Sequence, residues 1–221
     1  MNDVAEASIL VVTAVEAERE AVLRGLRGDA RFRVVAAGVG PAFAAAGAAF
    51  ALAQGDYKLV VSAGIGGGFP GRAGIGGIVV ADSIHAADLG AETADGFLGV
   101  EALGFGTARF AVDGALAERW TDAIRAAGRE ATRGPIATVS TATGTAATAE
   151  ALRARVPGVA AEAMEGAGVA AAAVVAGAAV LEVRAVSNAV GPRDRAAWRI
   201  GEALQALEAA FVIFTEVISK R

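Results

Sequence analysis

Three strand-length apolar runs, each followed at once by acids or glycines, set the main limit on how this chain can fold. SILVVTA (Ser8–Ala14) leads into a segment with helical spacing, and RFRVVAAGVG (Arg31–Gly40) leads into an alanine-rich stretch that Pro41 opens. YKLVVSA (Tyr57–Ala63) runs into a glycine-rich turn, Gly64–Gly68. Short β-branched runs predict buried strands, and proline suits a first helical turn. Strands that alternate with helices predict an α/β fold.

The rest of the chain continues this alternation. Further strands are predicted over Ile75–Ile84, from Gly134 into the Ser/Thr-rich turn that ends at Ala147, and over Val183–Ala189. Further helices are predicted over Val112–Gly128, Ala146–Arg155 and Arg195–Ser219, whereas residues 86–106 indicate only a loop rich in Gly and Asp. No linker or composition break divides the chain. We therefore expect one domain over residues 1–221, a three-layer α/β/α fold with a central mixed sheet.

Composition excludes several classes of function. The 221 residues include no cysteine and one histidine, which excludes disulfides, thiolate metal sites and histidine-rich metal sites. A net charge of −4 leaves no electrostatic footprint for nucleic acid. No stretch of about 18 residues is free of charge or glycine breaks, so no membrane span is expected. The N-terminus has acids where a signal peptide has basic residues. We expect a cytoplasmic protein without metal or cofactor.

Carboxylates are the strongest candidates for chemistry. In EAMEGAG, Glu162 and Glu165 stand directly ahead of a long apolar run, where a buried charge is costly unless it faces a cleft or a partner. Capping of a helix start by these two acids remains an equal alternative. Glu18 follows the first strand and is a candidate to face the mouth of the sheet, while Glu16 and Glu20 stay solvated. From spacing alone, a solvated helix face is the favoured interpretation for each of the three.

Two other features carry weaker signals. GIGGGF after the third strand is a poor match to a dinucleotide fingerprint, because it lacks the final glycine and leads to Phe69-Pro70-Gly71 rather than to a helix. A glycine turn that offers backbone amides to a sugar or an anion remains open. His85, at a predicted strand end, is either a general base or a structural histidine, and the structural role is favoured.

Several of these motifs occur together in one known superfamily. AVEAERE, AGVG, VVSAGIGGG, IVVAD, AEAMEGAG and VRAVSNAVG appear in the order found in the nucleoside phosphorylase/nucleosidase superfamily. The chain resembles methylthioadenosine/adenosylhomocysteine nucleosidases over nearly its whole length. The segment SNAVGPRDRAAW makes it more similar to the futalosine hydrolase family, whose reaction releases hypoxanthine on a route to menaquinone. The resemblance implies a nucleoside phosphorylase-like fold, a nucleoside substrate, no cofactor and a homodimer or higher homo-oligomer.

The resemblance also implies roles for particular residues. Glu18 corresponds to the glutamate that activates the attacking water, and Glu165 to the one that grips the ribose 2′- and 3′-hydroxyls. Met164 corresponds to the residue packed beneath the sugar. The turn formed by Gly64, Ile65, Gly66 and Gly67 is implied to line the sugar side.

Two departures from the nucleosidase pattern stand out. Ile65 replaces a serine near the water, which affects how that water is positioned. Gly77 replaces a common acid before the IVV strand.

Asn188 falls where adenine-specific nucleosidases have an aspartate. An asparagine amide cannot pass a proton to ring nitrogen 7, but its NH₂ can donate to a 6-oxo oxygen while its carbonyl accepts from a protonated nitrogen 7. This pattern favours hypoxanthine or guanine over adenine. The alternative is a turn asparagine that satisfies its own backbone.

The nearest rival activities are those of other superfamily members. An adenine-releasing nucleosidase is one alternative, and a purine nucleoside phosphorylase is another. Phosphorolysis needs arginines around a phosphate, yet Arg19 is flanked by Glu18 and Glu20 in the first turn. A nucleoside-binding protein without turnover is the non-enzyme alternative. Arg193 and Arg195 are candidates for binding the carboxylate of futalosine's benzoate arm, or are surface arginines paired with Asp194.

Overall fold

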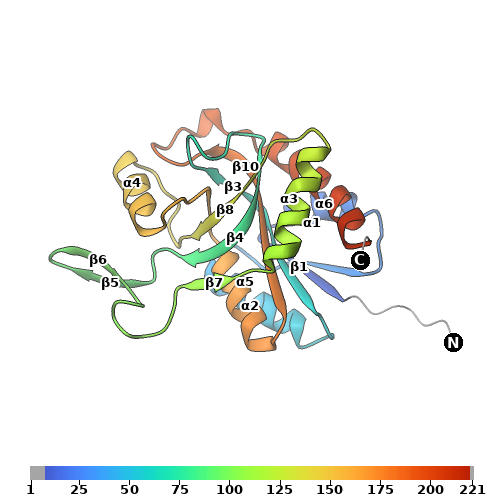
Figure 1. Ribbon diagram of the computed structural model, residues 1–221, viewed down its shortest axis with the longest axis horizontal. Coiled ribbons are helices and arrows are strands. Elements are labelled where there is room, and N and C mark those ends of the chain that lie inside the picture. Colours follow the sequence, from blue (N-terminus) through green and yellow to red (C-terminus); the bar gives the residue numbers. More distant parts are fainter. Residues whose placement is uncertain (1–7, 220–221) are drawn as a thin grey trace.

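The computed structural model describes residues 8–219 (Figure 1). The acidic N-terminal residues on which the signal-peptide argument rests, Asp3 and Glu6, lie outside the described residues. Figure 1 shows a central sheet with helices on both sides and a hairpin that projects from it. No helix among residues 8–219 is long and apolar enough to cross a membrane.

The central sheet is mixed, as expected, and part of it closes on itself. Its strands are β1 (Ile9–Thr13), β2 (Phe32–Ala36), β3 (Leu59–Gly68), β4 (Ile78–Ala86), β7 (Arg109–Ala111), β8 (Ala131–Thr138), β9 (Ala161–Ala163) and β10 (Ala179–Ala189). Their order is β10-β4-β8-β9-β3-β1-β2, with β7 on β4, and β10 pairs with β3 as well. Strands β3, β10, β4, β8 and β9 therefore form a ring, and β1 and β2 extend from β3.

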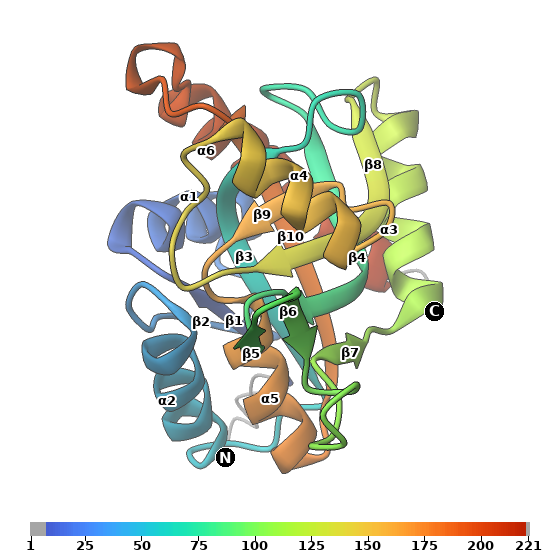
Figure 2. The same cartoon turned by 90° about the vertical axis from the view of Figure 1, so that its left-hand side faces the viewer.

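Helices cover both faces of this sheet (Figures 1 and 2). They are α1 (Glu16–Leu26), α2 (Pro41–Leu52), α3 (Gly114–Ala126), α4 (Ala146–Arg155), α5 (Gly166–Ala176) and α6 (Ile200–Ser219). Residues of α1, α3 and α6 share one core cluster, and residues of α2 and α5 share the cluster on the opposite side. Helix α4 covers a third, smaller cluster. The expected layers of helix, sheet and helix are present.

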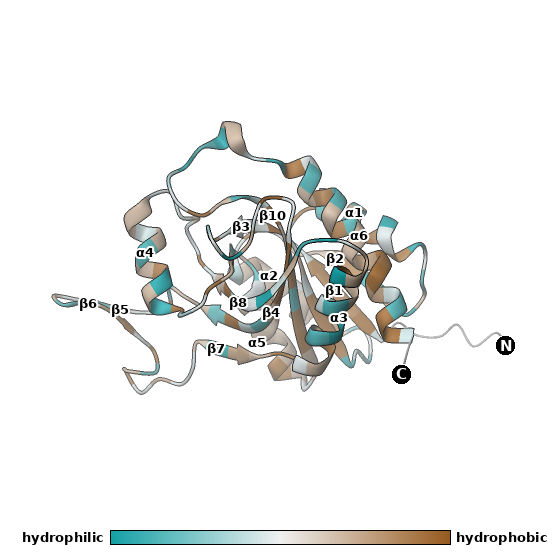
Figure 3. Ribbon diagram, turned by 45° about the horizontal axis from the view of Figure 1, so that its top comes forward, coloured by the Kyte–Doolittle hydropathy of each residue, from teal (hydrophilic) through white to brown (hydrophobic). Residues whose placement is uncertain are grey.

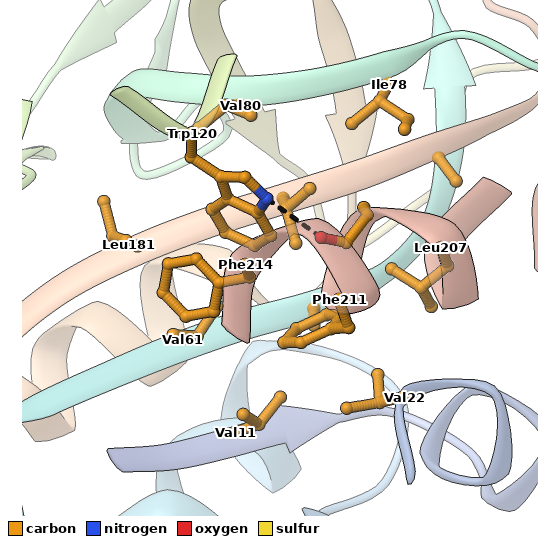
Figure 4. Packing of buried hydrophobic residues seen from close by; sticks show 14 of the residues in the cluster. Val11, Val22, Val61, Ile78, Val80, Trp120, Leu181, Leu207, Phe211 and Phe214 are labelled. Carbon is orange, nitrogen blue, oxygen red and sulfur yellow. Dashed lines mark hydrogen bonds between the residues drawn. The ribbon is translucent and has the colours of Figure 1, made fainter. Parts of the chain in front are cut away.

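The aromatic centre of the larger core joins α3 to α6 (Figure 4). The Trp120 ring stacks on Phe214 with centroids 4.0 Å apart and meets the edge of Phe211 at 5.5 Å. Its indole N–H donates to the carbonyl of Ala210 at 3.0 Å, so the ring is fully buried without an unpaired donor. Figure 3 shows hydrophilic and hydrophobic residues side by side on the outer helices.

The predicted glycine turn after the third strand is wrong. Strand β3 runs through Gly64–Gly68, which pair with β10, and Gly67 and Gly68 also pair with β9. A Cβ on Gly66 would lie 2.6 Å from the carbonyl oxygen of Glu162, and one on Gly68 would lie 2.4 Å from that of Ala73. Glycine is required at these positions because the backbone of neighbouring segments approaches closely. Since glycine has a low strand propensity, the sequence did not indicate that the strand continues here.

Other boundaries also differ from the sequence predictions. Glu162 lies in β9 rather than at a helix start, and only Glu165 is the N-cap residue of α5. The closing helix begins at Ile200, after a 3₁₀ turn at Arg195–Ala197, because the amide of Arg199 donates to Ser187 of β10 at 2.8 Å. The stretch predicted to be a loop contains a hairpin, β5 (Gly90–Thr93) and β6 (Gly96–Gly99), and Gly96, directly after its two-residue turn, has a φ of +118°.

Candidate active site

The candidate site lies at the carboxyl ends of β1, β3 and β10, which run parallel. Ligands of α/β sheets bind beyond this edge. A cavity of about 320 Å³ lies here, and it is lined by Ala14, Val15, Glu18, Val39, Ile65, Gly66, Gly67, Ala142, Thr143, Glu162, Ala163, Met164, Glu165, Ser187, Asn188, Arg193 and Trp198. Three buried carboxylates and one amide side chain therefore share one small space.

Glu18 is fixed by backbone amides from two elements. It lies on the first turn of α1, and its Oε2 accepts from the amides of Ala14 at 2.9 Å and Val15 at 3.2 Å. Its Oε1 accepts from the amide of Ile65 on β3 at 2.9 Å. Burial raises the pKa of Glu18, while the nearby Arg184 and these amides act in the opposite direction. Glu18 faces the mouth of the sheet and is buried, unlike the solvation that spacing alone favoured, whereas Glu16 and Glu20 are exposed.

Glu165 connects α5 with α2, the two helices on the opposite face of the sheet from α1. As the N-cap residue of α5 it is buried, and its Oε1 accepts from the amide of Gly40, the N-cap residue of α2, at 3.2 Å. Its Oε2 accepts from Arg184 Nη1 at 3.0 Å. The AGVG segment and the AEAMEGAG segment, far apart in the sequence, thus meet at this carboxylate.

Arg184 lies directly behind the two glutamates. Its side chain is 1% exposed, and each guanidinium nitrogen has a partner: Nη1 donates to Glu165, Nε to Glu182 at 2.9 Å and Nη2 to Ser62 Oγ at 2.9 Å. A fully buried arginine needs such pairing, because an unpaired buried charge is strongly destabilising. The guanidinium is therefore part of the structure behind the cavity rather than a free group inside it.

Asn188 and Glu162 flank a glycine on opposite sides. Gly67 of β3 is in register with Asn188 on β10 and with Glu162 on β9. The Asn188 NH₂ donates to the carbonyl of Ala189 at 3.1 Å, and its Oδ1 accepts from Ser187 Oγ at 2.8 Å. Glu162 accepts from both the amide and the hydroxyl of Thr143, and burial raises its pKa. Each side chain keeps hydrogen-bonding capacity for a ligand.

Most of the residues singled out from the sequence line this cavity. Glu18, Met164, Glu165, Ile65, Gly66, Asn188 and Arg193 do. Gly64 does not: a Cβ there would lie 2.6 Å from Glu18 Oε1 and 2.7 Å from Arg184 Nη1, so this glycine leaves room for both side chains. The Arg193 guanidinium lies 5.1 Å from the centroid of Trp198, and that of Arg195 lies 5.9 Å from it.

The pairing suggested for Arg193 and Arg195 is not found. Within residues 8–219 neither arginine forms an ion pair with Asp194, whose carboxylate instead accepts from the amide of Ala196 at 3.1 Å.

His85 lies at a different cavity, of about 500 Å³, beside the projecting hairpin. Its Nε2 is 3.0 Å from Ser83 Oγ, and burial together with Arg109 lowers its pKa. It does not line the candidate site, which agrees with the structural role favoured from the sequence. Within the described part of the chain no group of three or more His, Cys, Asp or Glu side chains could hold a metal ion.

Sequence reasoning did not identify Arg184, Ser62, Glu182 or Trp198. One signal was present: Glu182 and Arg184 alternate with apolar residues in LEVRAV, so both project to one side of a buried strand. Two ionisable residues on a buried face indicate a paired network. Ser62 carries no such signal, because it reaches Arg184 only through the pairing of β3 with β10.

Comparison with known proteins agrees with this geometry. The model of the phosphorylase superfamily matches residues 3–219, so the chain belongs to that superfamily. Within it, the chain is 54% identical over 219 residues to a futalosine hydrolase of Streptomyces coelicolor, covering 90% of this chain and 91% of that protein. It is 51% identical over 215 residues to a futalosine hydrolase of Acidothermus cellulolyticus, covering 91% and 88%.

Solved structures show the same fold at lower sequence identity. A 5′-methylthioadenosine/S-adenosylhomocysteine nucleosidase of Neisseria meningitidis, in complex with methylthio-immucillin-A, aligns with a TM-score of 0.79 at 22% identity, covering 96% of this chain and 98% of that chain. The corresponding nucleosidase of S. pneumoniae aligns with a TM-score of 0.82 at 19% identity, covering 95% and 99%. The expected nucleoside phosphorylase-like fold is confirmed.

Proposed function

We propose that this chain hydrolyses the N-glycosidic bond of futalosine, a 6-oxopurine nucleoside, and releases hypoxanthine as a step of menaquinone biosynthesis. One observation carries the proposal: Glu18, Glu165 and Asn188 line a single cavity at the carboxyl edge of the sheet. The futalosine hydrolases with which the chain shares about half of its residues support the choice of substrate.

Glu18 is proposed as the general base. The C1′–N9 bond breaks with its electron pair leaving on the purine, and water attacks the oxocarbenium-like sugar while Glu18 takes a proton from that water. The purine anion takes up a proton from solvent and leaves as neutral hypoxanthine. Three backbone amides fix the Glu18 carboxylate, so its orientation is set before the substrate binds. A base placed in this way contributes about 10²–10⁴-fold.

Glu165 and Met164 are proposed to hold the sugar. The Glu165 carboxylate is in charge-assisted contact with Arg184, and its oxygens can accept from the ribose 2′- and 3′-hydroxyls. A negative charge close to the sugar also stabilises the positive charge that develops there in the transition state. Met164 is half-buried in the same wall and offers an apolar surface to the ribose.

Asn188 and Glu162 are proposed to select the base. One hydrogen of the Asn188 NH₂ is engaged by Ala189, which leaves the other for the 6-oxo oxygen. Glu162, on the other side of Gly67, can accept from the N1–H that hypoxanthine has and adenine lacks. Adenine would place an amino group against the Asn188 donor and a ring acceptor against the Glu162 carboxylate, so the site favours 6-oxopurines.

Water rather than phosphate is the proposed nucleophile. Arg193 is the only basic residue among those that line the cavity, and Arg184 is occupied by Glu165, Glu182 and Ser62. A phosphate site would need converging cations, whereas Glu18 presents a negative charge at the place where an anion would sit.

Arg193 is proposed to bind the carboxylate of the benzoate arm of futalosine. It lies at the cavity beside Trp198, whereas Arg195 contacts the same ring but does not line the cavity. The variant R193A should raise KM for futalosine by about tenfold and leave KM for inosine, which has no such arm, unchanged. R195A is the matched control, and equal KM values in R193A and the wild type would exclude this role.

Release of free purine tests the whole proposal. Purified protein is supplied with futalosine, inosine, methylthioadenosine or adenosylhomocysteine, each with and without phosphate. Hypoxanthine from futalosine without phosphate, with the adenine nucleosides inert, is the expected result. A requirement for phosphate would identify a phosphorylase, adenine release would identify an adenine nucleosidase, and binding without release would identify a nucleoside-binding protein.

The assembly and location of the protein are further proposals. We infer that residues 1–221 form one domain that acts in the cytoplasm as a homodimer or higher homo-oligomer. Phe43 and Phe50 on α2 are 69% and 71% exposed and Val175 on α5 is 90% exposed, and apolar groups of this size are typical of interfaces. Sedimentation equilibrium measures the assembly, and a purely monomeric mass would exclude it.

A further inference from the structure

A fully buried glutamate outside the cavity has no role in the steps described above. Glu182 lies on β10 and is 0% exposed. Its Oε1 accepts from Arg184 Nε, and its Oε2 has no hydrogen-bond partner within the described residues. A carboxylate in this position is costly, and a neutral residue of similar shape would avoid that cost.

The space around Glu182 is shaped to hold it. A Cβ on Gly166, the first residue of α5, would lie 2.2 Å from Glu182 Oε2 and 2.4 Å from both Cδ and Oε1. The carboxylate therefore lies against the backbone that directly follows Glu165. On β3 the residue in register with Glu182 is Ser62, which accepts from the same guanidinium.

Arg184 connects Glu182 to both glutamates of the site. Glu182 binds Nε while Nη1 binds Glu165, so the guanidinium cannot rotate without breaking a charged hydrogen bond. Nη1 and Glu18 Oε1 both border the position that a Cβ on Gly64 would fill, and the charge of Arg184 acts on Glu18 without a direct ion pair. Glu182 and Glu165 are thus bonded to Arg184, and Glu18 lies within reach of its charge.

We propose that Glu182 is a positioning residue, which fixes the guanidinium of Arg184 and offsets its charge so that Glu18 stays basic enough to activate water. The inference rests on the proposed function, because it assigns Glu18 the part of general base. Glu182 itself touches no substrate and acts only through Arg184.

The charges around Glu182 set the direction of the effect. The groups that face it are Arg184 on the same strand, Glu165 at the start of α5 and, beyond the guanidinium, Glu18 on α1. Arg184 favours the ionised form of Glu18 and so opposes the effect of burial on its pKa. A second negative charge on the far side of Arg184 reduces that influence, and its removal should lower the pKa of Glu18.

The test is the variant E182Q, whose amide oxygen can still accept from Arg184 Nε. The acid limb of kcat/KM for inosine should move to lower pH by about one unit, because the cluster loses a negative charge. At neutral pH the weaker base should lower kcat by about three- to tenfold. E208Q makes the same chemical change at the exposed Arg24–Glu208 pair and should leave both quantities unchanged.

A second variant separates charge from packing. E182D keeps the negative charge in a shorter side chain, so its acid limb should stay at the wild-type pH even if its kcat falls. If the acid limb of kcat/KM in E182Q stayed at the wild-type pH, the inference would be overturned. It would also be overturned if the limb moved equally in E182D.

Carbon-13 NMR titration of the Glu18 carboxyl in both variants measures the same shift without turnover. Different results would therefore overturn the proposed function and the role of Glu182. An inactive wild type overturns the proposed function, and an unmoved Glu18 titration in E182Q overturns the role of Glu182.

Discussion

At the scale of single residues, the site depends on the hydrogen bonds that hold its carboxylates in place. Glu18 has three backbone donors, Glu165 has two backbone amides and a guanidinium, and Glu162 has the amide and hydroxyl of Thr143. Each carboxylate is thereby held at the cavity wall in one orientation. Such preorganisation favours reaction, because the groups need not reorient when charge develops.

Replacement of the proposed base should separate chemistry from binding. E18Q keeps the shape of Glu18 but cannot take a proton from water, so kcat should fall by about 10²–10⁴-fold with little change in KM. Hypoxanthine release measures both constants. E16Q is the matched control, because Glu16 lies two residues away with an exposed side chain. Near-normal turnover in E18Q would mean that another group activates the water.

The pH dependence of the wild type reports the state of the same residue. Glu18 works ionised, so activity is present above its pKa and is lost as the pH falls through it. Because burial raises this pKa, the acid limb of kcat/KM should lie above the usual range of an exposed glutamate. A kcat/KM profile across the acid and neutral range measures the limb, and its absence from E18Q would assign it to Glu18.

The purine base that the protein releases should depend on the side chain at position 188. N188D introduces a group that can carry a proton to ring nitrogen 7, and it removes the donor to the 6-oxo oxygen. The ratio of kcat/KM for inosine to kcat/KM for methylthioadenosine should fall by about a hundredfold or more. S187A, which removes the hydroxyl that donates to Asn188 Oδ1, should change this ratio far less. An unchanged ratio in N188D would contradict the assigned role.

At the scale of elements, the position of Glu165 depends on how closely α5 approaches α2. A Cβ on Gly168 of α5 would lie 2.1 Å from the carbonyl oxygen of Pro41, the first residue of α2. The two helices meet here without a side chain between them. This close contact keeps the Gly40 amide within reach of Glu165.

The variant G168A should push the two helices apart. Overpacking of a tight contact costs about 1–3 kcal/mol of unfolding free energy, even though alanine favours a helix. Urea unfolding measures the loss, and kcat should fall with it because Glu165 moves. G201A is the control, since a Cβ there meets nothing within 4 Å and should stabilise α6 by up to about 1 kcal/mol. Equal stability of G168A and the wild type would contradict the close contact.

At the scale of the whole molecule, the aromatic group around Trp120 holds the helices on one face of the sheet together. Trp120 on α3 contacts Phe211 and Phe214 on α6. Residues of β1, β3, β4 and β10 belong to the same cluster. Residues of helix α1, which carries Glu18, belong to this cluster as well, so the packing of this core also holds a residue of the site in place.

Truncation of this ring should therefore destabilise the entire fold. W120A should lower the unfolding free energy by about 3–5 kcal/mol, with an unchanged dependence on urea if unfolding stays cooperative. W198A removes the other tryptophan, which is half-buried at the cavity, and should cost less than half as much. Equal losses in the two variants would show that the Trp120 cluster is not the main support.

Much of this molecule could be predicted from its sequence. Short β-branched runs marked β1 and β2, and the periodic apolar positions of the last helix marked α6, because these patterns arise from local geometry. Glu18 was a candidate for the mouth of the sheet because it directly follows a strand, but its role as general base came from the resemblance. The roles assigned to Glu165, Met164 and Asn188 came from resemblance and remain predictions.

The remaining features depend on contacts between distant segments, so local sequence patterns do not indicate them. Gly64–Gly68 are strand because β10 and β9 lie on both sides of them, which no local preference of glycine indicates. Glu162 joins the cavity through the pairing of β9 with β3, and Arg184 reaches Ser62 and Glu165 through the same sheet. Local sequence patterns indicated most of the helices and strands in their order, but not β5, β6, β7 or β9. The closed pairing of β10 with both β3 and β4 decided which charges share one buried space.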